Sequence, residues 1–91
     1  MPRESRLVLR VELAKDRRRW LADCVTIPGI LVYGTSPIDA FRKAQALALD
    51  VLADRVRHGE HPLTGKKMAR VGTGFRAVEF ERAGQAAVAG Q

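Results

Sequence analysis

Residues 20–56 read WLADCVTIPGILVYGTSPIDAFRKAQALALDVLADRV, and this stretch decides the fold. Pro28-Gly29 interrupts its first half, because proline lacks the amide hydrogen that strand pairing needs and glycine readily adopts positive φ. The residues before this pair predict a strand. Those from Ile30 to Tyr33 predict a second, shorter extended run, which Gly34 closes. The remainder of the stretch predicts one long helix.

The helix has clear start and stop signals. Ser36 is a good N-cap, and Pro37 suits the first helical position because its missing N–H would have no partner there. Asp39 completes a variant of the capping box. Gly59 can take the left-handed conformation that often follows a helix. The sequence therefore predicts a helix from Pro37 to about His58.

One side of this helix is apolar. The apolar residues recur at intervals of three and four, as one buried helix face requires, and are Phe41, Ala44, Leu47, Ala48, Val51 and Leu52. Leu49 and Ala53 lie off this stripe. They are either scattered surface residues, which are common, or part of a second contact surface.

An alternating pattern upstream predicts one more strand. Its inward side chains are Leu7, Leu9, Val11 and Leu13, and its outward ones are Val8, Arg10 and Glu12. Residues 15–19 form a polar connection, and residues 20–27 predict the returning strand of a hairpin. Three interpretations of its inward face stay open. Either Leu21, Val25 and Ile27 point inward, or Trp20, Ala22 and Cys24 do, or both faces of the strand are covered.

The part after the helix predicts one further strand. Residues 58–74 carry prolines and glycines and indicate a long connection, and residues 75–81 predict an edge strand with a charged outer face. The segment 83–91 is small and polar, which predicts a flexible tail. The expected fold is α+β, a small antiparallel sheet with one helix packed on it, in the order β-β-β-α-β. It forms a single domain over residues 1–82.

The charge is positive and unevenly distributed. The chain has a formal net charge of +6, and the excess of Lys and Arg falls in residues 1–20 and 55–91, whereas residues 21–54 carry more Asp and Glu. Such clusters of cations attract phosphates and carboxylates. No stretch approaches the roughly 20 apolar residues of a membrane span. We expect a soluble, unprocessed, cytoplasmic protein in which the lone Cys24 is a small buried residue.

The polar residues do not predict catalysis. Metal-dependent RNA hydrolysis needs several converging carboxylates, and the pattern gives no such convergence for Asp23, Asp39, Asp50 and Asp54. His58 and His61 have a spacing seen in metal sites, but no third ligand is near in sequence. We expect no enzyme activity, no metal and no cofactor.

The order of the motifs resembles the N-terminal domain of HicB-type antitoxins. The matching features are the Trp20-Leu21-Ala22 strand, the Ile27-Pro28-Gly29 turn, the YGTSP run at residues 33–37, and Ala40 in an alanine-rich helix. The likeness covers roughly residues 7–58, with residues 75–81 as the family's final strand. It implies a partly degraded ribonuclease H-like or double-stranded-RNA-binding-like fold that forms homodimers or larger oligomers. It also implies a role in binding and masking a small HicA-type toxin that cleaves mRNA.

Two functions follow from these observations. The first is an antitoxin whose sheet surface and exposed strand edge cover a basic toxin, with the contact placed at the acidic central part of the chain. Its candidate residues are Trp20, Asp23, Tyr33, Asp50 and Asp54. The alternative is a stand-alone HicB-like protein without a toxin partner, which binds RNA or DNA or serves a regulatory role. Its candidate contacts are Arg17, Arg18, Arg19, Lys66 and Lys67.

Overall fold

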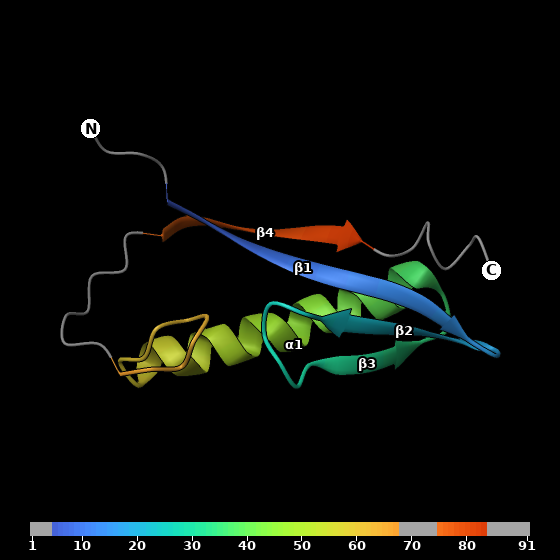
Figure 1. Ribbon diagram of the computed structural model, residues 1–91, viewed down its shortest axis with the longest axis horizontal. Helices are drawn as coiled ribbons and strands as arrows, with labels where there is room; N and C mark the ends of the chain where they lie inside the picture. Colours follow the sequence, from blue (N-terminus) through green and yellow to red (C-terminus); the bar gives the residue numbers. More distant parts are fainter. Residues whose placement is uncertain (1–4, 68–74, 84–91) are drawn as a thin grey trace.

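The computed structural model describes residues 5–67 and 75–83. It contains the strands β1 (Ser5–Asp16), β2 (Arg19–Cys24) and β3 (Leu31–Gly34), the helix α1 (Pro37–Arg57), and the strand β4 (Phe75–Ala83) (Figure 1). The predicted order β-β-β-α-β and the α+β class are confirmed. The predicted tail lies almost wholly outside the described residues.

The four strands form one sheet in the order β3-β2-β1-β4. β1 pairs antiparallel with β2, and β2 with β3, but β4 pairs parallel with β1. The sheet is therefore mixed, and the prediction of an antiparallel sheet was wrong in this respect. The reason is that α1 carries the chain back along the sheet, so β4 begins at the same end as β1 and runs in the same direction (Figure 1).

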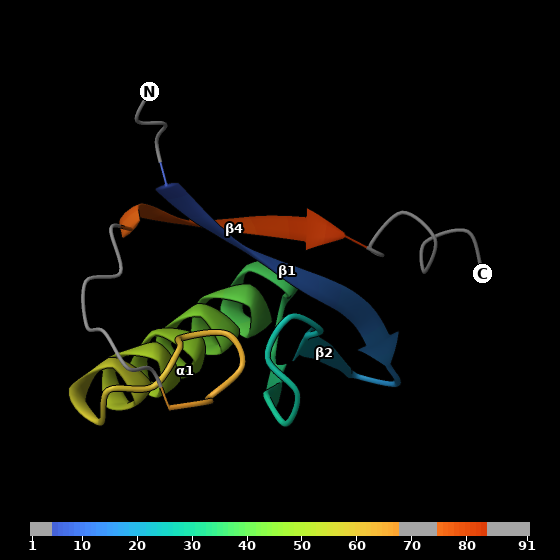
Figure 2. The ribbon, with the colours of Figure 1, turned by 60° about the vertical axis from the view of Figure 1, so that its left-hand side comes forward.

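The core lies between α1 and one face of this sheet. β1 contributes its predicted inward residues, all buried, and α1 faces them with a line of small residues: Leu7, Leu9, Val11 and Leu13 against Ala40, Ala44, Ala48 and Leu52. Alanines let the helix approach the strands closely, and each fully buried leucine contributes about 1.5–3 kcal/mol. The opposite face of the sheet has no element over it within the described residues (Figure 2).

The register resolves the open question about β2. Cys24 pairs with Val11 and Ala22 pairs with Leu13, so both lie on the core face and are fully buried. Trp20 packs partly against the same core. The strand ends at Cys24 rather than at Ile27, which is buried within the following turn. Cys24 is thus a buried apolar residue, as predicted.

The start of α1 matches the sequence signals, with one exception. The Ser36 hydroxyl accepts a hydrogen bond from the Asp39 amide at 3.0 Å. The reciprocal bond of Asp39 goes to the amide of Thr35 at 2.9 Å, one residue earlier than in the standard capping box. Gly34 lies against the helix, since a Cβ there would sit 2.7 Å from the Cα of Ala40. A side chain at position 34 would push α1 off the sheet.

The helix face differs from the prediction at one position. Ala40, Ala44, Ala48 and Leu52 form its buried line, and Phe41 and Val51 pack partly against the core. Leu47 was predicted to be inward and is 38% exposed. At 3.6 residues per turn, position 47 lies about 100° from position 48, at the margin of the contact. The helix ends at Arg57, with His58 as C-cap and Gly59 at φ +70°.

Candidate protein-interaction surfaces

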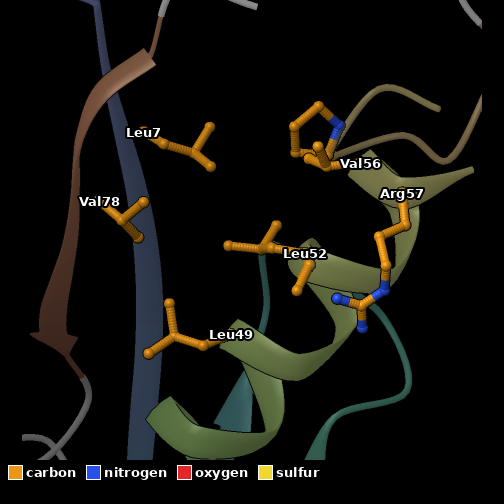
Figure 3. A pocket seen from close by; sticks show the side chains of 8 residues that line it. Leu7, Leu49, Leu52, Val56, Arg57 and Val78 are labelled. Atoms are coloured by element: carbon orange, nitrogen blue, oxygen red, sulfur yellow. The ribbon is translucent and has the colours of Figure 1, made fainter. Parts of the chain in front are cut away.

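An open apolar groove of about 440 Å³ lies between the second half of α1 and the strands β1 and β4. Figure 3 shows Leu7 and Val78 on the strand side, facing Leu49, Leu52 and Val56 on the helix. The groove is lined by Leu7, Leu49, Leu52, Ala53, Val56, Arg57, Pro62 and Val78. Arg57 is the one charged residue in this lining.

The sequence builds this groove from a second, weaker apolar stripe. Leu49, Ala53 and Val56 recur at steps of four and three, so they share one side of α1 next to its buried line. Val78 is in register with Leu7 on the same sheet face. Leu49 and Ala53, for which two interpretations were left open, both line this groove. Val56 and Val78 were not singled out as site residues.

A hydrogen-bonded loop closes one end of the groove. The guanidinium Nη1 of Arg55 donates to the carbonyls of Pro62 and Leu63 at 2.8 and 2.9 Å. Within the loop, the His61 amide donates to the carbonyl of Lys66 at 2.8 Å. These bonds hold the buried Pro62 against the helix end. The first part of the predicted long connection is therefore ordered, and residues 68–74 lie outside the described part.

The sheet face opposite α1 carries both apolar and charged side chains. Val8, Leu31 and Tyr33 are exposed there, beside charged residues that include Arg10, Glu12, Asp23, Glu79 and Glu81. The guanidinium of Arg19 lies over the Tyr33 ring at 3.9 Å, a contact worth about 0.5–1 kcal/mol at an exposed site. A protein partner can contact this face without disturbing the core.

The residues predicted to bind a protein partner are spread over three surfaces. Trp20 lies on the core side of β2, and the ammonium of Lys15 lies 5.7 Å from its ring. Asp23 and Tyr33 lie on the open sheet face. Asp50 and Asp54 are exposed, and each lies two positions from Leu52, hence on the side of α1 away from the sheet. The structure does not bring the three aspartates together.

The predicted nucleic-acid contacts lie at opposite ends of the molecule. Arg17 and Arg18 form the two-residue turn between β1 and β2, and Arg19 begins β2. Lys66 and Lys67 lie in the loop beyond the other end of α1 (Figure 1). The longest extent of the molecule is 45 Å. All five side chains are exposed, so each end presents cations to solvent.

Two of the helix carboxylates, Asp39 and Asp54, have partners within the chain. A hydrogen bond from the Thr35 amide, aided by the ammonium of Lys43 at 3.2 Å, holds the pKa of Asp39 below its ordinary value. Asp54 lies 3.5 Å from the His58 ring. Within residues 5–67 and 75–83, no three His, Cys, Asp or Glu side chains are grouped as a metal site requires. His58 and His61 gain no third ligand there.

Comparison with known proteins finds no matching family model, no matching curated protein and no matching solved structure. Among the described residues, no helix has the length and apolar character needed to cross a membrane.

Proposed function

We propose that this chain is a HicB-like antitoxin that binds and neutralises a small HicA-type mRNA-cleaving toxin in the cytoplasm. Two observations support the proposal. The residues from 20 to 52 follow the family's order of strand, Pro-Gly turn, short strand and capped helix. The chain also has a small sheet with one helix packed on it, which is the fold that this resemblance implies.

The exposed apolar side chains are the reason for proposing that the binding partner is a protein. Leu49 and Val56 are each 46% exposed and Val78 is 40% exposed, and all three meet in one groove. Exposed apolar side chains that lie next to one another commonly mark an interaction site, whereas single ones are normal on a protein surface. The open sheet face adds Leu31 and Tyr33. A protein that masks another by covering it needs surfaces of this kind.

The test is an RNA-cleavage assay with a purified HicA-type toxin encoded next to this chain. We expect cleavage to stop at about one chain per toxin molecule. A second, unrelated ribonuclease acting on the same RNA is the control, because a chain that only coats RNA would protect it from both enzymes. Undiminished toxin activity at a large excess of the chain would refute the proposal.

The exposed cations favour a second candidate function. Arg17, Arg18 and Arg19 stand together at the hairpin tip, where they can reach phosphates. In this alternative the chain binds RNA or DNA without a toxin partner. Affinity should then fall steeply as salt rises from about 50 to 200 mM, because phosphate contacts release counterions. No detectable binding at the lower salt concentration would exclude this function.

A further inference from the structure

The lining of the apolar groove contains one charged side chain, that of Arg57. It is exposed, and among the described residues no carboxylate forms an ion pair with its guanidinium. The carboxylate one turn before it, that of Asp54, lies 3.5 Å from the ring of His58 instead. Asp50 lies a further turn away, on the side of α1 that faces away from the sheet. The positive charge of Arg57 is therefore not neutralised within this part of the chain.

The position of Arg57 connects this charge to the interior of the groove. Long side chains on a helix point toward its N-terminus, so the Arg57 side chain runs back over Ala53, one turn earlier. Figure 3 shows it running along α1 to the level of Leu52. Ala53 also lines the groove and carries only a methyl group. A ligand therefore has room to extend from the guanidinium across position 53 into the apolar interior.

The rest of the lining indicates which ligand would fit. The lining residues other than Arg57 are all leucine, valine, alanine or proline. In the described part of the chain, the lining thus offers no hydroxyl or amide group to bind a sugar and no aromatic ring on which a base could stack. Its aliphatic side chains favour a flexible hydrocarbon chain.

The size and shape of the groove favour a small ligand. Its volume of about 440 Å³ lies within the range of about 300–1,000 Å³ that is usual for small-molecule sites. The loop that Arg55 holds through the carbonyls of Pro62 and Leu63 closes one end. A helix of a partner protein would need a groove open at both ends, whereas a short hydrocarbon chain does not.

The charges around the groove also favour an anionic head group. The helix side of β4 carries Arg82, whose guanidinium lies 5.5 Å from the centre of the Phe41 ring, beyond the groove lining. Glu79 and Glu81 point to the opposite face of the sheet. No carboxylate of the described residues lines the groove.

We propose that the groove binds an aliphatic carboxylate of medium chain length, such as octanoate or decanoate. The hydrocarbon chain lies between α1 and the strands β1 and β4, and the carboxylate accepts hydrogen bonds from the Arg57 guanidinium. Burial of methylene groups supplies affinity, and the charged hydrogen bonds select the anionic head group. The proposal goes beyond the proposed function and does not depend on it.

The direct test is a titration of the isotope-labelled full-length chain, followed by NMR. Octanoate, 1-octanol and octylammonium are added separately, below the concentrations at which they aggregate. We expect octanoate to shift the methyl resonances of Leu49, Val56 and Val78, and to bind at least about tenfold more tightly than octylammonium. Equal affinity for all three compounds, or shifts confined to other parts of the chain, would overturn the proposal.

A series of carboxylates tests the contribution of the hydrocarbon chain. Hexanoate, octanoate and decanoate share one head group and differ only in length. Each added methylene should tighten binding about two- to fourfold while it is buried. Equal affinity for the three would mean that only the head group is bound, and the groove would then not be the site.

One pair of variants tests the role of Arg57. Arg57→Gln should weaken octanoate at least about tenfold and leave 1-octanol nearly unchanged. Arg18→Gln is the control, because it removes the same charge from the hairpin tip at the other end of the molecule. Equal weakening by the two substitutions would mean that octanoate follows the net charge of the chain, which would contradict a site at Arg57.

A second pair of variants tests the groove. Leu49→Ser and Leu31→Ser each remove an exposed leucine, 46% and 52% exposed, from the groove and from the sheet face opposite α1. Only Leu49→Ser should weaken decanoate, by about tenfold. Circular dichroism shows whether each variant is folded. Decanoate that binds both variants equally well would place the ligand outside the groove.

Sedimentation and toxin neutralisation complete the test. We expect octanoate to leave the mass of the chain unchanged. A dimer in which octanoate cannot shift the groove resonances would mean that a second copy covers the groove, and the proposal would be wrong. A chain that neutralises the toxin but does not bind octanoate would overturn this site alone. A chain that binds octanoate but does not neutralise would overturn only the antitoxin function.

Discussion

Asp39 joins the end of β3 to the beginning of α1. Its carboxylate accepts from the Thr35 amide and pairs with Lys43, which lowers its pKa. The stability that it contributes is therefore present above its unfolded pKa of about 3.9 and is lost as the pH falls through the lower folded value. We predict that Asp39→Asn lowers the melting temperature at pH 7, and that its gap from the native chain narrows below about pH 4.

Thermal unfolding from pH 7 to pH 2 measures this effect. Asp50→Asn is the matched control, because Asp50 is an exposed helix carboxylate on the side of α1 away from the sheet. It should change the melting temperature little at any pH. A gap for Asp39→Asn that stays constant down to pH 2 would show that the charge of Asp39 contributes nothing.

Arg17 has φ +60°, an uncommon conformation for a residue with a side chain, and the next residue, Arg18, does not share it. Glycine at position 17 removes the conformational strain of a positive φ, which costs about 1 kcal/mol. It also raises the entropy of the unfolded chain, which opposes this gain. We predict that Arg17→Gly leaves the free energy of unfolding unchanged or raises it slightly. Arg18→Gly should lower it by about 0.5–1 kcal/mol. Urea unfolding measures the free energy of unfolding of both variants. Equal decreases in the two would contradict a positive φ at Arg17 alone.

Single residues were largely predictable where the cause is local. Ser36 and Pro37 act within one helical turn, and Gly59 needs only its own φ, so the sequence indicated all three. Leu47 was predicted wrongly, because its exposure depends on how α1 lies across the sheet. The contact between Gly34 and Ala40 has the same origin and has no sequence signal of its own.

At the scale of elements, Arg55 ties the loop after α1 to the helix end. Its guanidinium donates two hydrogen bonds to carbonyls of this loop, those of Pro62 and Leu63. We predict that Arg55→Met lowers the free energy of unfolding by about 1–2 kcal/mol. It should also speed hydrogen exchange of the His61 and Gly65 amides, which bond within the loop.

Arg57→Met is the control for this substitution. Arg57 is an exposed arginine of the same helical turn, so its replacement should cost about 0.5 kcal/mol or less. Equal losses in the two variants would mean that the loop is not held by the Arg55 guanidinium. Exchange is followed by NMR, which separates local opening of the loop from global unfolding.

The types and order of the elements were predictable, and the pairing of β4 was not. The alternation of apolar and polar residues predicted β1, the Pro-Gly pair predicted the break after β2, and the capping residues predicted the start of α1. Each is a pattern of near neighbours. The direction of β4 depends on where α1 returns the chain, and nothing in Phe75–Ala83 itself distinguishes a parallel from an antiparallel partner.

At the scale of the whole molecule, the two basic ends lead to a prediction for the nucleic-acid alternative: the affinity for a duplex depends on the length of the duplex. They lie at opposite ends of a body 45 Å long. B-form DNA rises 3.4 Å per base pair, so a duplex must have about 13 base pairs to reach both. If the chain binds duplexes, affinity should rise between about 8 and 16 base pairs, and Lys66→Glu with Lys67→Glu should remove that gain. Fluorescence anisotropy at fixed salt measures it; equal affinity for both lengths would mean that only one end binds.

The candidate surfaces could be predicted only in part. The arginines of the hairpin tip and their exposure were evident in the sequence. Asp23, Asp50 and Asp54, which were predicted to contact a protein partner, carry the same charge and come from the same acidic segment of the sequence. The sheet and the helix nevertheless direct them to different sides of the molecule. The groove joins Leu7, Leu49 and Val78, which lie on three elements, so only the folded chain brings them together.

The parallel pairing of β1 with β4 also sets an order of assembly. The β1-β2 and β2-β3 pairs join neighbouring segments, such as Lys15 with Trp20, whereas the β1-β4 ladder joins Leu7 to Val78 across most of the chain. Closing so large a loop costs chain entropy, and the contacts of β4 offset this cost only when the rest of the sheet has formed. Formation of the β1-β4 pair is therefore slow. We therefore expect β4 to join the sheet after β1, β2 and β3 have paired. The strand that borders the groove is then the last part of this sheet to form.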